Sequence, residues 1–150
     1  MELGKPTRTY TLRGQLDPST LNQRLLLFDG QFDTAFKIIE FEVSTSSPTT
    51  SSADASMIIS TEPCVTANDW DWSDNRQIAW SQYISQGGDS GVFPRSFVDP
   101  DNLVVQDLYI SAFVASGQKG NYMITLEKYD IDDWKGALAM VRNSSQSVGN

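Results

Sequence analysis

Short runs of alternating apolar and polar residues are the feature that most constrains this fold. Residues 8–16 alternate with a period of two, which is typical of a strand buried on one face. Turn-forming pairs such as Asp17-Pro18 and Asp29-Gly30 interrupt the alternating segments. The pattern predicts about seven or eight strands, hence an all-β antiparallel sandwich that is jelly-roll-like, with immunoglobulin-like order as the alternative. The other expected strands are 23–28, 36–44, 56–60, 77–84, 108–115 and 121–129.

Two of these segments carry finer predictions about facing and connection. Within 36–44, the residues Ile39, Phe41 and Val43 alternate with polar neighbours, so we expect them on the core face. Between the last two strands, 116–120 reads Ser-Gly-Gln-Lys-Gly, which predicts a tight hairpin turn.

Two further segments lie outside this strand pattern. Residues 44–56 contain nine Ser or Thr among thirteen residues and predict an exposed loop, because they offer little apolar surface to bury. Residues 131–143 begin near a helix-capping aspartate, Asp132, and are rich in helix formers, so we expect a short helix. At this length, residues 1–150 are expected to form a single domain.

The composition excludes several functions. The net charge of −8 disfavours nucleic acid as the main partner, because the surface repels phosphate. The chain has no histidine, which removes imidazole catalysis and histidine-ligated zinc, and its single cysteine, Cys64, has no internal disulfide partner. No apolar run approaches the length of a membrane span. We therefore expect a soluble protein that needs no cofactor and is not an enzyme.

An acidic and aromatic segment around residue 70 is the sharpest local motif. Asp69, Asp71 and Ser73 have the spacing of the first three EF-hand ligands, but position six is Asp74 and position twelve is Trp80. An EF-hand is thereby excluded, and an irregular calcium loop of Asp69, Asp71 and Asp74 remains as one hypothesis. The other interpretation is a polar turn whose tryptophans pack on the sheet.

The tryptophans of this region predict a binding surface. Trp70, Trp72 and Trp80 are candidates for an aromatic platform that takes a sugar ring or a protein partner. Core packing is the alternative, because aromatic side chains dominate cores as well as interfaces.

The first 24 residues are mildly basic in an acidic chain. We expect Lys5, Arg8 and Arg13 to contact a neighbouring subunit, with solvated surface charges as the alternative.

Three blocks of sequence resemble small proteins of environmental marine viruses and phages: residues 4–14, 26–30 and 74–80. The resemblance identifies no catalytic residue. It implies an all-β structural protein located in the virion, such as a capsid, minor coat or decoration subunit, whose partners are other copies of itself and other virion proteins. The alternative function is a carbohydrate-binding module using exposed tryptophans, with or without calcium. A hydrolase built on two facing carboxylates is a third possibility.

Overall fold

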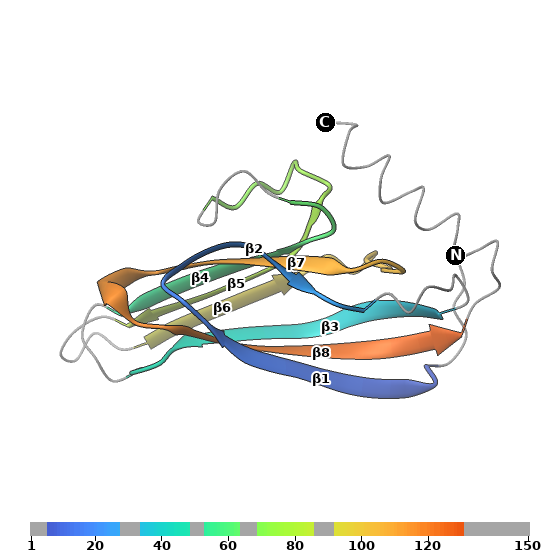
Figure 1. Cartoon of the computed structure of the whole chain (residues 1–150), viewed down its shortest axis with the longest axis horizontal. Helices are drawn as coiled ribbons and strands as arrows, with labels where there is room; N and C mark the ends of the chain where they lie inside the picture. The colour runs from blue at the N-terminus through green and yellow to red at the C-terminus, as the bar shows by residue number, and fades with distance from the viewer. Residues whose placement is uncertain (1–5, 28–33, 49–52, 64–68, 86–91, 131–150) are drawn as a thin grey trace.

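The computed structural model describes residues 6–27, 34–48, 53–63, 69–85 and 92–130. In these residues, eight strands form two antiparallel sheets stacked face to face (Figure 1), which confirms the predicted all-β sandwich. A short 3-10 helix, η2 (Ala115–Gly117), precedes the last strand. The strands are β1 (Arg8–Leu16), β2 (Ser19–Leu25), β3 (Thr34–Thr45), β4 (Asp54–Ser60), β5 (Gln77–Ser85), β6 (Val92–Val98), β7 (Leu108–Val114) and β8 (Gly120–Asp130).

The strand order is nested in the manner of a jelly roll. The smaller sheet has the order β1-β8-β3 and the larger has β2-β7-β4-β5-β6. The pairs β1·β8, β2·β7 and β4·β5 are what results when one long antiparallel hairpin is rolled into two sheets. The pair β3·β6 would complete the series, but β6 pairs with β5 instead. The nested pairs favour the jelly-roll description over the immunoglobulin-like one.

The predicted hairpin at 116–120 is wrong, although the strands on either side of it are present. β7 belongs to the larger sheet and β8 to the smaller, so this connection crosses between the sheets. A local turn signal does not reveal that β7 and β8 find their partners in β2 and β1, at the other end of the chain. Gly120 is closely packed: a Cβ there would lie 2.5 Å from Met57 Cε and 2.9 Å from Val114 Cγ2, so both side chains would have to shift.

The predicted core face of β3 is also partly wrong. Its pairing with β8 shifts register between Ile38 and Glu40, which is the mark of a β-bulge. As a result Ile38 is buried at 1% exposure, whereas Ile39 is 39% exposed. Phe41 and Val43 face the core as expected. The alternation in the sequence does not reveal the extra residue at the bulge, which moves the side chain of Ile39 to the outer face of the sheet.

The core lies between the two sheets. Side chains from both sheets form one cluster, in which Phe41, Met57, Ile110 and Leu126 are almost completely buried. β4 and β5 are also buried on their outer face, where Ile58 and Trp80 form a second, smaller cluster. That outer cluster explains why β5 has no clean period of two.

Several boundaries differ from the sequence predictions. β3 extends to Thr45 and β4 begins at Asp54, so the predicted 44–56 loop is shorter, and both Thr45 and Ala53 are buried. β6 was not predicted, because it contains Pro94; a proline is tolerated there because β6 is an edge strand.

Two predictions cannot be compared with the structure: the 131–143 helix and the turn at Asp29-Gly30 lie outside the described residues. In the part of the chain that is described, no helix is long and apolar enough to cross a membrane.

Candidate functional site

The outer face of the larger sheet carries the aromatic cluster that the sequence singled out. The indole N–H of Trp70 donates to Ser56 Oγ at 2.8 Å, and that of Trp80 donates to Gln77 Oε1 at 2.8 Å. Trp80 is only 7% exposed, and Trp70 is half-buried. Both indoles therefore pack on the sheet with their polar groups satisfied, as the core-packing interpretation expected.

Trp72 is the exception, because 63% of its surface is exposed. Its ring centroid lies 5.9 Å from that of Trp80, at an interplanar angle of 59°, and 5.4 Å from that of Phe97, at 68°. The structure does not align the three predicted tryptophans as one flat platform. It presents a single exposed indole that packs at an angle against two other rings. Arg95 lies beside them, 5.3 Å from the Phe97 centroid.

The three predicted calcium ligands are not brought together. Asp71 accepts hydrogen bonds from the backbone N–H and the hydroxyl of Ser73, which closes the turn. Asp74 forms a bidentate ion pair with Arg76, with distances of 2.8 and 2.6 Å, and these hydrogen bonds lower the pKa of the Asp74 carboxyl. Asp69 is exposed. Among the described residues, no group of three or more acidic, cysteine or histidine side chains is arranged to hold a metal ion.

The predicted basic contact is divided between two surfaces. Lys5 lies outside the described residues. Arg8 and Arg13 both lie on β1, but they are an odd number of residues apart and so point to opposite faces of the sheet. Arg8 lies over the ring of Tyr10, 4.6 Å from its centroid, while Arg13 lies on the outer face, opposite Met123. The two arginines therefore do not form one patch.

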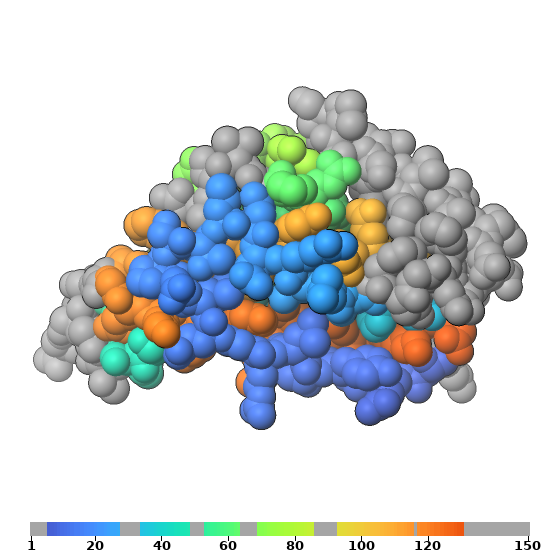
Figure 2. All heavy atoms as spheres, viewed as in Figure 1, coloured from blue at the N-terminus to red at the C-terminus, as the bar shows by residue number. Residues whose placement is uncertain are grey.

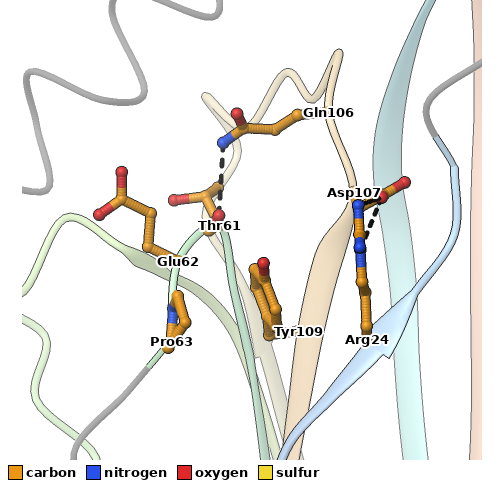
Figure 3. A pocket seen from close by; sticks show the side chains of 7 residues that line it. All are labelled: Arg24, Thr61, Glu62, Pro63, Gln106, Asp107 and Tyr109. Atoms are coloured by element: carbon orange, nitrogen blue, oxygen red, sulfur yellow. Dashed lines mark hydrogen bonds and ion pairs between the residues drawn. The ribbon is translucent and has the colours of Figure 1, made fainter. Parts of the chain in front are cut away.

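A polar pocket of about 210 Å³ opens where β2 and β4 end and β7 begins (Figure 3). Asp107 is held there by Arg24 at 2.6 Å and by the backbone N–H of Leu27 at 2.7 Å, so both carboxylate oxygens are engaged. Gln106 donates to the Thr61 carbonyl at 3.3 Å. The remaining lining residues are Glu62, Pro63 and Tyr109. Sequence reasoning missed this pocket, because its residues come from three separated segments with no shared motif.

The four sheet edges differ in how they are protected. β2 contains a bulge, with Asn22 at a positive φ of 58°, and β6 contains Pro94. The β3 edge is covered by a bridge from Phe36 to Val104 and by the side-chain amide of Asn102, which bonds both backbone groups of Ile38. Bulges, prolines, covering segments and charged side chains are devices that discourage an edge strand from pairing with another chain.

In the described part of the chain, the β1 edge has no bulge, proline or covering segment, and its charged side chains are Arg8 on the core face and Arg13 on the outer face. β1 pairs with β8 without a register shift from Arg8 to Leu16, and it contains no proline. Within the described residues, no strand pairs with its other side. Tyr10 and Leu12 on its core face are only partly buried. In the space-filling view, the first strand, coloured dark blue, lies at the surface along the lower side of the molecule (Figure 2). Among the described strands, this regular edge therefore has a pairing partner on one side only.

Comparisons with known proteins give no family. No protein-family model matches the chain, and no curated protein matches it in sequence. One solved structure that resembles it comes from the Bacillus endospore appendages, described as a novel family of disulfide-linked pili. The match has 11% sequence identity and a TM-score of 0.33, and it covers 88% of this chain and 96% of that one. A score this low supports no conclusion about function.

Proposed function

We propose that this protein is a non-catalytic structural subunit of a virion, a capsid, minor coat or decoration protein that assembles with copies of itself and with other virion proteins. The observation that carries the proposal is the regular β1 edge, nine residues long, which no other described strand pairs with on its outer side. The nested strand order supports it by analogy, because jelly rolls recur in viral capsid proteins. The same architecture also serves lectins, so the fold alone does not assign the function.

Addition of a strand at β1 would both satisfy the outward backbone groups of this edge and bury more of its core-facing side chains. A close side-chain fit is not required, because the backbone groups of an edge strand bond any extended segment of matching register. The incoming strand would also cover the partly buried Tyr10 and Leu12, which extends the core across the contact. Where the incoming strand is a second β1 in antiparallel register, Arg8 and Arg13 never oppose each other, because they lie on opposite faces.

Two adjacent proline variants test the edge. Successive backbone N–H groups of a strand point to opposite sides, so one of Tyr10→Pro and Thr11→Pro removes a bond to β8 and the other removes only an outward donor. We expect one variant to remain folded by circular dichroism yet fail to assemble, as measured by light scattering and by incorporation into purified particles. A folded edge variant that assembles like the wild type would refute the β1 contact. A wild-type chain absent from particles and monomeric at every concentration would refute the function.

A carbohydrate-binding module is the second candidate, and the exposed Trp72 is the observation that favours it. An exposed indole can stack on a sugar ring, and Arg95 and Gln82, opposite each other in the register of β5 and β6, supply nearby polar groups. Titration with a panel of oligosaccharides should quench tryptophan fluorescence, and Trp72→Ala should abolish the quenching. An unchanged response in Trp72→Ala would exclude this use of the indole.

A further inference from the structure

The outer face of the smaller sheet has a regular arrangement of charge. Cross-strand pairing places Arg13 of β1, Met123 of β8 and Glu42 of β3 in one row across the three strands. The next row contains Thr11, Thr125 and Glu40. Side chains paired in this way lie on the same face. The face thus carries one basic side chain on β1, Arg13, and two acidic side chains, Glu40 and Glu42, on the second half of β3.

This face is open and its charges are available. Arg13 and Glu42 are exposed, and neither forms an ion pair in the described part of the chain. Met123, between them, is 45% exposed, which makes it one of the few large apolar side chains left in solvent. A second sheet face with the same row could place its charges opposite these, so that Arg13 and Glu42 pair across the contact and Met123 is covered between them.

We propose that a second copy of this chain packs on this face, related by a two-fold axis that runs parallel to β8. Such a rotation turns the second sheet over and exchanges its β1 and β3 sides. Arg13 then lies opposite Glu42 of the second copy, Glu42 lies opposite its Arg13, and Met123 meets its own equivalent. A two-fold axis running across the strands would instead place Arg13 against Arg13, so the charges select the first arrangement.

The neighbouring rows agree with this arrangement. Thr11 faces Glu40 of the second copy, and Thr9 faces its Lys37. Glu127 meets its equivalent, but Lys37 is its cross-strand neighbour and offsets the like charges. Stacked sheets cross at about −30°, so the end rows diverge and the contact is centred on the Met123 row.

The interface is small. Three strands about 4.8 Å apart and four rows about 7 Å apart give roughly 400 Å² per copy, from standard sheet spacings. A stable complex buries about 800 Å² per partner, so this contact is weak in isolation. It would become effective in an assembly where several contacts act together. The interface rests on the proposed function as an assembling subunit, but it uses a surface distinct from the β1 edge.

Charge reversal tests the pairing directly by sedimentation equilibrium of the full chain at up to about 1 mM, a range suited to an interface this small. Arg13→Glu and Glu42→Arg should each weaken self-association at least tenfold, because each turns two attractive pairs into repulsive ones. The double variant Arg13→Glu/Glu42→Arg should recover it. A mixture of the two single variants should form a heterodimer, in which all four facing charges are again opposite. Raised salt should weaken the wild-type dimer.

Arg95→Glu is the matched control, because it makes the same charge change on the other sheet at an exposed position; it should leave association unchanged. If the mixture of single variants does not associate, the interface is refuted. If all variants associate as the wild type does, the interface is refuted, and the chain must assemble through another surface. A wild-type chain that is monomeric at about 1 mM but present in purified particles also refutes this interface and leaves the proposed function intact. A chain that is monomeric and absent from particles refutes both.

Discussion

Asn102 provides the sharpest test of how this sandwich is held together. Its side chain is buried at 5% exposure, and it acts as a short substitute strand on the β3 edge. The amide oxygen accepts the N–H of Ile38 at 2.8 Å, and the amide nitrogen donates to the Ile38 carbonyl at 3.0 Å and to the Asp99 carbonyl at 2.7 Å. These bonds satisfy the backbone at the bulge that the register shift creates in β3.

Replacing Asn102 with alanine removes all three bonds and leaves buried backbone groups without a partner. Each unsatisfied group costs about 1–3 kcal/mol, so we expect Asn102→Ala to lower the free energy of unfolding by about 3 kcal/mol. For a chain of this size, that corresponds to a fall in Tm of roughly 6–12 °C. Asn102→Asp has nearly the same volume, but its carboxylate faces two carbonyl oxygens, so it should also destabilise the fold at neutral pH and recover partly when it is protonated.

The measurement is thermal and urea unfolding followed by circular dichroism at low protein concentration. Asn121→Ala is the matched control, because Asn121 makes one exposed side-chain bond, to Gln15, and its loss should cost about 0.5 kcal/mol or less. If Asn102→Ala lowers Tm no more than Asn121→Ala does, the assigned role of the amide on the β3 edge is wrong.

Four further substitutions have defined outcomes. Gly120→Ala should destabilise by about 1–3 kcal/mol in urea unfolding, because its Cβ would meet Met57 and Val114 at 2.5 and 2.9 Å. Asp74→Asn should cost about 1–2 kcal/mol at neutral pH. Because Arg76 lowers the Asp74 pKa below its ordinary value of 3.8, this stabilisation is present above that value and is lost as the pH falls through the lowered pKa; a difference that persists in strong acid would contradict the ion-pair account. Trp80→Ala should cost about 3–5 kcal/mol and Trp72→Ala less than about 1 kcal/mol, so equal losses would refute the assigned burial.

The sequence predicted the class of fold and most of its strands. Alternation identified β1, the turn pairs separated the segments, and the strand at 108–115 lies close to the observed β7. These signals are local, because the alternation of apolar and polar residues directly reflects which face of the strand each side chain lies on. The sequence did not predict β6, because Pro94 argues against a strand. Proline has no backbone N–H to donate, so a strand can contain it only at positions where no ladder hydrogen bond is needed, such as the outer side of an edge strand.

The candidate site was predicted less well than the fold. The sequence correctly drew attention to the tryptophans, but the exposure of Trp72 and the burial of Trp80 depend on which residues lie beneath them. The acidic motif had ligand-like spacing, yet Arg76 neutralises Asp74 and the turn uses Asp71 internally. The pocket around Asp107 had no sequence signal, because its walls are assembled by the sheet.

By itself, the sequence determined that this chain forms short amphipathic strands and that catalysis based on histidine is absent. Only the tertiary structure decided how those strands pair. The 116–120 turn favoured a hairpin, but β7 pairs with β2 and β4 and β8 pairs with β1 and β3, so that both strands contribute side chains to the core between the two sheets. The same long-range pairing leaves the β1 edge open and aligns Arg13, Met123 and Glu42 in one row, and the proposals for assembly depend on both features.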